Sequence, residues 1–291
     1  MAIKRLRKTT RQHISALKRT WPLYGLVILI SLIFILPFLW LVSTSFKDLS
    51  EAFSIPPKLL PQVFHPENYV EVFKRIPFAR YTMNTMVISI SCVAGILFSA
   101  PLAAYAVSKI KWIGSNILFP IMIATMLIPF QVTMIPLYMT FRQLGWIGTY
   151  LPLTVPAFLG AGIGGGYYIF LLRQFFLGMP DSLIEAAKME GAGEFRIFLS
   201  VILPLCTAAL ITVGIFTFLN TWSDFMGPLI YLTKNSLYTL SLGLQAFLTS
   251  HHVEWNLLMA ASMLFSLPTM VLFFVAQRYF IEGAKTSGLK F

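Results

Sequence analysis

The sequence predicts an all-α polytopic membrane protein, and three observations support that expectation. Of its 291 residues, 57% are hydrophobic and only 11% are charged, whereas a soluble domain carries about 25% charged residues. Several stretches of about twenty residues, the length of a membrane-spanning helix, contain no Asp, Glu, Lys or Arg. Basic residues gather at the N-terminus, where residues 1–20 hold seven of the 22 Lys and Arg. Lipid is therefore the expected solvent for most of the chain.

Six apolar segments are long enough to cross about 30 Å of hydrocarbon as helices. The first is not a cleaved signal peptide, because its apolar run exceeds the roughly 7–15 residues of such a signal and no small-x-small site follows it. Prolines inside several segments predict kinks. The expected spans are residues 23–43, 85–107, 117–138, 151–172, 202–219 and 257–277.

The distribution of basic residues predicts the orientation of these spans. With the N-terminus in the cytoplasm, the inner segments 1–22, 108–116, 173–201 and 278–291 hold fifteen of the 22 Lys and Arg, as the positive-inside rule requires. We therefore expect a basic cytoplasmic N-terminal segment (1–22), a six-span domain (23–277) and a cytoplasmic tail (278–291). The net charge of +11 is a topology signal and does not indicate nucleic-acid binding.

The sequence argues against catalytic chemistry on this chain. It has no G-x-x-x-x-G-K-[ST] loop for ATP phosphates, no H-E-x-x-H pair and no nucleophile elbow. Cys92 and Cys206 lie in apolar runs without metal-ligand neighbours, so we expect them to pack as hydrophobic residues. No enzyme activity, cofactor or metal site is expected.

A cluster of glycines at residues 160–166 formally contains the G-x-G-x-x-G pattern of dinucleotide-binding loops. That pattern requires a preceding strand, whereas here it lies inside an apolar span. We expect the cluster to let helices approach closely, as small residues do in lipid.

The connection between spans four and five predicts a short helix. Ser182 stands three residues before Glu185, the spacing of a capping box, and Gly191 and Gly193 follow as end signals. A second helix should begin near Glu194. The first helix has about two turns and is too short to be stable alone, so it should dock on another surface. Leu183, Ala186, Ala187 and Glu190 share one face and form the expected docking face.

The run Glu185-Ala186-Ala187-Lys188-Met189-Glu190-Gly191-Ala192, followed by Ile202-Leu203-Pro204-Leu205, resembles the EAA loop of binding-protein-dependent ABC importer permeases. The resemblance implies that residues 180–205 form a cytoplasmic coupling loop, whose helix sits in a cleft of a separate ATPase subunit and transmits its closure to the pore. It assigns coupling within residues 182–193 to Leu183, Glu185, Ala186, Ala187, Glu190 and Gly191.

Further patterns resemble the carbohydrate branch of these permeases, and specifically its maltose-type, MalG-like six-span member. They are Trp40 with Ser45-Phe46-Lys47, Asn68-Tyr69, Asn220-Thr221-Trp222-Ser223-Asp224-Phe225, Tyr238-Thr239-Leu240, and Pro268 with Gln277-Arg278-Tyr279. The tail departs from the branch, since it ends Gly288-Leu289-Lys290-Phe291 where a Lys-Gly pair is common.

The resemblance implies a subunit that forms half of the pore of an ATP-driven sugar importer, with oligosaccharides as the expected substrates, in the bacterial plasma membrane. Its implied partners are a second related permease, two copies of an ATP-binding subunit that hold ATP and Mg, and an extracytoplasmic solute-binding protein. Candidate translocation-path residues are Asn84, Gln131, Asn220, Trp222 and Asp224. Capping and anchoring of the outer end of span five is the stronger explanation for Asn220, Trp222 and Asp224. Contacts between helices explain Asn84 and Gln131 equally well.

Three other functions stay open. The first is an ABC importer permease for another solute, such as glycerol phosphate, a polyamine or an amino acid. The second is a secondary transporter or channel that works without an ATPase, although the spans lack the ionisable residues that usually carry a coupled charge. The third is a membrane anchor that assembles other proteins.

Overall fold

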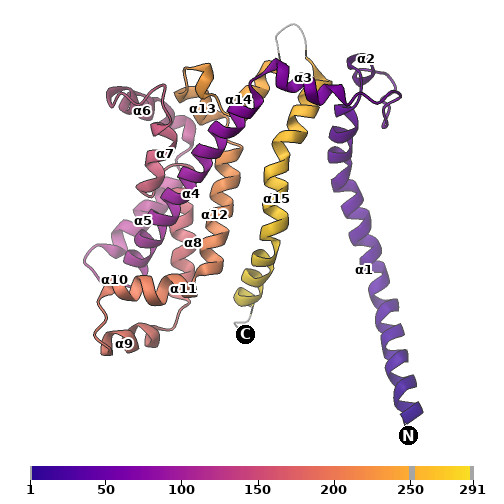
Figure 1. Cartoon of the computed structure of the whole chain (residues 1–291). Coiled ribbons are helices and arrows are strands. Elements are labelled where there is room, and N and C mark those ends of the chain that lie inside the picture. Colours follow the sequence, from indigo (N-terminus) through magenta and orange to yellow (C-terminus); the bar gives the residue numbers. More distant parts are fainter. Residues whose placement is uncertain (1, 249–252, 289–291) are drawn as a thin grey trace. The chain divides into compact units, whose positions relative to one another are not determined.

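The computed structural model describes residues 2–248 and 253–288, which are helical throughout apart from loops and one isolated bridge (Figure 1). Residues 289–291 of the expected tail, and His251 and His252, lie outside the described residues. The helices are α1 (Ala2–Ser45), α2 (Leu49–Ala52), α3 (Glu67–Arg75), α4 (Phe78–Ser108), α5 (Ser115–Met126), α6 (Phe130–Gln143), α7 (Leu151–Phe158), α8 (Gly165–Leu177), α9 (Asp181–Met189), α10 (Glu194–Ile197), α11 (Leu203–Leu205), α12 (Thr207–Trp222), α13 (Met226–Tyr231), α14 (Leu240–Gly243) and α15 (Trp255–Gly288).

Three helical segments within the described residues are long and apolar enough to cross a membrane unaided. They are Trp21–Ser45 of α1, Phe78–Ser108, which is α4, and Trp255–Gln277 of α15. They contain the first, second and sixth expected spans. α4 continues through Pro101 and α15 through Pro268, so these prolines do not break their helices.

The third and fifth expected spans are bent. Ile117–Met126 and Phe130–Gln143 meet at 101°, and Glu194–Leu205 and Thr207–Trp222 meet at 79°. The first bend falls at Pro129, which has extended backbone angles (φ −60°, ψ 141°), and a proline disfavours helical geometry in the residue before it. Residues 117–138 are therefore not one straight helix, as the hydropathy pattern alone would suggest.

The fourth expected span, residues 151–172, is split into α7 and α8. Gly160, Gly162 and Gly164 have φ of +71°, +85° and +78°, in the left-handed region that glycine tolerates best. The glycine cluster thus ends one helix and starts the next, which corrects the expectation that it lies within a continuous span. Close helix packing occurs at Gly166 of this cluster, where a Cβ would lie 3.0 Å from Met126 Cγ of α5, and at Gly95 of α4, where a Cβ would lie 2.9 Å from the Phe158 backbone nitrogen at the end of α7.

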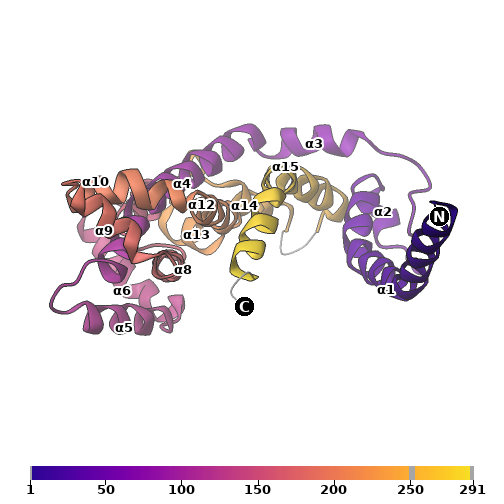
Figure 2. The same ribbon diagram turned by 90° about the horizontal axis from the view of Figure 1, so that it is seen from below.

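The chain divides into two compact units. One consists of the described parts of Met1–Val72 and Phe247–Leu264, and the other of those of Phe73–Ala246 and Phe265–Phe291. In the second unit α4 is central and lies beside α7, α8 and α12 (Figure 1, Figure 2). Its core is formed by buried apolar side chains from α4, α8 and α12, joined by residues of the α9–α11 segment.

The first unit brings two of the local sequence patterns together. The carboxamide of Asn68 donates to the backbone oxygens of Ser45 and Lys47, both at 2.9 Å. The Ser45 hydroxyl lies 2.8 Å from the Tyr69 hydroxyl. Lys47 is buried, and its ammonium lies 4.4 Å from the centre of the Trp40 ring. These residues fix the turn at which the chain leaves α1.

Candidate docking site and candidate path residues

Helix α9 begins directly after Pro180 and ends at Met189. Asp181 in its first turn and Lys188 in its last complement the helix dipole. Gly191, with φ of +81°, then reverses the chain, as its position in the sequence predicted. The expected reciprocal cap between Ser182 and Glu185 is absent from the described contacts, because the helix starts one residue earlier and Ser182 lies within its first turn.

The two sides of α9 differ in their surroundings. Ile184 is buried, and Ala187 packs against the core of the second unit. Leu183, Glu185, Ala186 and Glu190, together with Met189, are exposed. Five of the six residues assigned to coupling are therefore exposed, since Gly191 is exposed as well, whereas Ala187 faces the chain's own core.

The α10 segment extends the exposed side of α9. Ile197, Phe198 and Ile202 are buried along a helical stretch that includes a π-helical turn over Phe198–Ile202. Phe195, on the outside, is 67% exposed, and Met189 of α9 is 89% exposed. Leu183, Ala186, Met189 and Phe195 together form what we call the outer loop surface. Figure 1 shows α9 and α10 at one end of the second unit. Exposed apolar side chains of this kind are typical of a binding surface.

Polar contacts hold this segment to the end of α4. Lys109 donates to the Asp181 carboxylate at 2.5 Å and to the Met179 carbonyl at 2.9 Å. The Tyr105 hydroxyl donates to Glu194 Oε2 at 2.7 Å, and Lys188 Nζ lies 2.7 Å from Glu194 Oε1. The hydrogen bond from Lys109 and its charge lower the pKa of the Asp181 carboxyl below its ordinary value.

Three candidate path residues lie at the end of α12, in different surroundings. The side chain of Trp222 is fully buried, stacks on Phe218 and Phe265 and donates to the Phe265 carbonyl at 3.0 Å. Asn220 is exposed and donates to the Tyr168 hydroxyl at 2.8 Å. Asp224 is partly buried, and its carboxylate accepts from the Gly227 amide at 3.1 Å. Burial raises the pKa of this carboxyl.

The other two path candidates lie apart from these. Asn84 on α4 is buried and donates to the carbonyls of Ser236 and Tyr238, at 3.0 and 2.9 Å. Gln131 is exposed in the first turn of α6, directly after the bend. The structure therefore joins Asn84 to the 235–240 loop and does not gather the five residues into one cluster.

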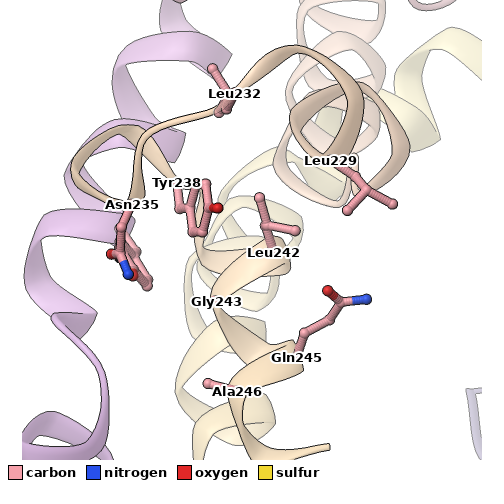
Figure 3. Close-up of a pocket in the computed structure, with 9 residues that line it drawn as sticks. Leu229, Leu232, Asn235, Tyr238, Leu242, Gly243, Gln245 and Ala246 are labelled. Atoms are coloured by element: carbon pink, nitrogen blue, oxygen red, sulfur yellow. Dashed lines mark hydrogen bonds between the residues drawn. The ribbon is translucent and has the colours of Figure 1, made fainter. Parts of the chain in front are cut away.

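A pocket of about 220 Å³ lies beside that loop (Figure 3). Its lining contains two tyrosine rings and two carboxamides among apolar side chains, with no charged residue and none of the five path candidates. The lining residues are Tyr81, Leu229, Leu232, Asn235, Tyr238, Leu242, Gly243, Gln245 and Ala246. The Tyr81 hydroxyl donates to Asn235. Aromatic faces and carboxamides are groups that can bind a neutral polar solute.

Sequence reasoning missed Lys109 and Tyr105 as partners of the loop. In the sequence, Lys109 is one of the basic residues that predict the orientation, and Tyr105 is part of an expected span. The carboxylates they contact, Asp181 and Glu194, are 72 and 89 residues further along the chain. A single sequence contains no signal for such pairs.

Comparisons with known proteins agree with this architecture. Residues 95–285 match the family described as binding-protein-dependent transport system inner membrane component. The chain is 31% identical to the probable ABC transporter permease protein YurM of Bacillus subtilis, over 87% of this chain and 83% of that protein. It is 30% identical to the arabinooligosaccharides transport system permease protein AraQ of Halalkalibacterium halodurans, over 90% and 93% of the two chains.

The fold is also similar to that of a solved structure. A chain in the crystal structure of a bacterial ABC transporter that imports the acidic polysaccharide alginate superposes with a TM-score of 0.75 at 23% identity, covering 90% of this chain and 97% of that one. The chain is thus an all-helical, multi-pass membrane protein that carries no cofactor and is not itself an enzyme, since ATP is bound and hydrolysed by a separate subunit. It belongs to the binding-protein-dependent transport system inner membrane components and is a permease subunit of an ABC importer.

Proposed function

We propose that this permease imports neutral sugars, oligosaccharides among them. Two observations support this substrate class. The relative AraQ is named for arabinooligosaccharides. The pocket beside Tyr81 and Tyr238 offers aromatic rings and carboxamides without a charge, which suits hydroxyl-rich solutes better than ions.

The chain crosses the inner membrane six times, with α5–α6, α7–α8 and α11–α12 each serving as one broken crossing. Both termini and the α9–α10 segment then face the cytoplasm. The positive-inside distribution of Lys and Arg supports this orientation. Broken helices are tolerated at membrane depth where neighbouring helices or a water-filled cavity satisfy their backbone groups, as is expected beside a translocation path.

The outer loop surface docks in a cleft of an ATP-binding subunit. The observation that carries this assignment is the contrast between the two sides of α9: Ile184 and Ala187 are held by the chain's own core, while Leu183, Ala186 and Met189 are exposed. A helix of nine residues whose other side is already packed presents this exposed apolar side as a surface on which a partner can bind.

In the complete transporter this chain pairs with a second related permease on two copies of the ATP-binding subunit. An extracytoplasmic solute-binding protein delivers the sugar. When ATP draws the two ATP-binding subunits together, α9 moves with its cleft and the spans rock to open the outer face. Among the path candidates, Asn220 and Gln131 are exposed and can contact the solute. Asn84, Trp222 and Asp224 support the elements around the path.

Co-purification tests the docking assignment. The tagged chain is co-expressed with the other transporter subunits and isolated in mild detergent, and Ala186→Arg places a long charged side chain on the outer loop surface. We expect the recovered ATP-binding subunit to fall by about tenfold or more, as for the loss of a central interface contact. Gly191→Pro, which cannot adopt a positive φ, should have the same effect.

The matched control is Ile113→Arg, which adds the same cation at a fully exposed apolar position in the loop after α4. This control should leave the ATP-binding subunit bound. Retention of the ATP-binding subunit by Ala186→Arg, or recovery of a chain that transports without any ATPase, would contradict the assignment.

The substrate class is tested with the same complex in proteoliposomes. Uptake of labelled neutral oligosaccharides should depend on ATP and on the solute-binding protein. Unlabelled glycerol phosphate and polyamine at equal concentration should not compete. Competition by glycerol phosphate alone would instead assign the transporter to phosphorylated solutes.

A further inference from the structure

Side chains from other segments donate hydrogen bonds to the end of α4 nearest α9. The carbonyl of Ala106 accepts from the Trp112 indole at 2.9 Å, and the carbonyl of Val107 accepts from Arg173 at 3.3 Å. The last carbonyls of a helix lack partners within it. These bonds therefore fix the terminus of α4 firmly enough to serve as an anchor for the loop beside it.

Two side chains extend from this terminus to the two ends of the loop. Lys109 contacts Asp181 at the start of α9, and Tyr105 contacts Glu194 at the start of α10. The side chain of Lys109 is only 6% exposed, whereas that of Asp181 is 75% exposed. Solvent therefore screens the attraction at the carboxylate, but the enclosed ammonium keeps a fixed position with a second bond to the Met179 carbonyl. We call these contacts the α4 clamp.

Few other contacts hold α9. Ile184 is its one buried side chain among the described residues, with Ala187 partly buried. Lys188 of α9 forms an ion pair with Glu194, and the Tyr105 hydroxyl donates to the same carboxylate. This ion pair therefore also links α9 to the α4 clamp. These polar side-chain contacts, which tie α9 and its neighbour Glu194 to the membrane helices, thus all lead to α4.

The opposite end of α4 is fastened to the 235–240 loop. Asn84 donates to the carbonyls of Ser236 and Tyr238, and the Thr85 hydroxyl accepts from the Leu240 amide at 2.8 Å. Tyr81, one turn away, lines the pocket of Figure 3. The 31 residues of α4 span about 46 Å at 1.5 Å per residue, so one continuous helix connects the loop at one end with the pocket at the other.

We propose that α4 is the element that transmits displacement of α9 to the 235–246 segment, and that Lys109 and Tyr105 are the positioning residues that make this transmission possible. The inference rests on the proposed docking of α9 on the ATP-binding subunit. A helix anchored by polar bonds at both ends moves as a unit, so both ends must shift when α9 is displaced. Without the clamp, α9 would follow its partner while α4 remained in place.

The test uses the whole transporter in proteoliposomes. Lys109→Met keeps the length of the side chain and removes its charge, Asp181→Asn removes the other charge at an exposed position, and Lys109→Arg is the conservative variant. Three quantities are measured: the amount of ATP-binding subunit in the complex, its basal ATPase rate, and the ratio of the rate with solute-loaded binding protein to the basal rate. This last quantity is the coupling ratio.

We expect Lys109→Met and Asp181→Asn to keep the ATP-binding subunit bound and to lower the coupling ratio by roughly fivefold or more, the usual range of a coupling between sites. The double variant should lose no more than either single one, because both remove the same contact. Lys109→Arg should retain at least half of the coupling ratio. Tyr105→Phe should lower it as well.

Two results overturn the inference. One is a coupling ratio within twofold of wild type for Lys109→Met or Asp181→Asn. The other is a loss of assembled complex in parallel with the coupling ratio in both variants, which would mark a structural role. Failure of the docking assignment is distinguishable from these, since Ala186→Arg would then leave the ATP-binding subunit bound.

Discussion

Asn220 and Trp222 belong to one short sequence pattern, yet they have different surroundings. The indole of Trp222 is enclosed by Phe218 and Phe265, while the carboxamide of Asn220 is exposed. Two positions apart on a helix, side chains point about 200° from each other. The pattern therefore combines one residue that holds α12 against α15 with one whose exposed carboxamide donates to the Tyr168 hydroxyl.

Replacement of Trp222 tests its structural role. Trp222→Ala should destabilise the protein by about 3–5 kcal/mol, as for the loss of a large buried aromatic side chain, and Trp222→Phe by less. The thermal denaturation midpoint of the detergent-solubilised complex measures the change. Ser223→Ala, at an exposed neighbouring position, is the control and should shift it little. A Trp222→Ala protein with normal stability and altered sugar selectivity would show instead that the residue lines the path.

The local role of a residue could be predicted from the sequence more readily than the side chain that it contacts. Gly191 was identified correctly as the residue that ends α9, because a positive φ has a local signature. The pairing of Lys109 with Asp181 could not be identified, since it depends on how α4 and α9 pack in three dimensions. The expected docking face includes Ala187, which packs against the chain's own core, because periodicity groups residues by face without indicating which face the core covers.

At the scale of the elements, hydropathy locates the apolar segments but does not show where the helix within a segment bends. The first, second and sixth expected spans lie within continuous helices, but the third and fifth are bent by 101° and 79°. An apolar run has the same hydropathy whether or not its helix is broken. The breaks depend on backbone geometry at particular residues, such as Pro129 and the glycines between α7 and α8.

A pair of glycine substitutions tests the break between α7 and α8. In Gly165→Ala the new Cβ would collide with the carbonyl oxygen of Gly160 and lie 2.9 Å from its carbon. This crowding should cost about 1–3 kcal/mol and reduce the amount of folded permease in the membrane. Quantitative immunoblotting and the denaturation midpoint measure the effect.

Gly214→Ala in α12 is the matched control. Its Cβ would meet only Leu97 Cδ1 at 3.6 Å and Val93 Cγ1 at 3.8 Å, which is ordinary contact. Alanine is favoured over glycine inside a helix by about 0.5–1 kcal/mol, so this variant should be as stable as wild type or slightly more. Equal behaviour of the two variants would show that the glycine loop can rearrange without cost.

At the scale of the molecule, α1 carries a long apolar surface that can face lipid or protein. Between Trp21 and Leu36 its apolar side chains are exposed on every side. Helices in lipid gain little from burying such side chains against one another, because the lipid is equally apolar. Any protein neighbour would therefore have to recognise α1 by shape, and the second permease of the proposed transporter is the one we expect.

Photo-crosslinking along α1 distinguishes a protein neighbour from lipid. Leu29, Leu32 and Leu36 lie on one face, and Val27, Ile30 and Phe34 on the opposite face. With benzoylphenylalanine at each position in turn, we expect crosslinks to the second permease from one of the two sets and crosslinks to lipid from the other. Mass spectrometry of the products identifies the partner. Crosslinks to the second permease from both sets would show that α1 is surrounded by protein, and crosslinks to lipid alone would show that the permeases pair through other helices.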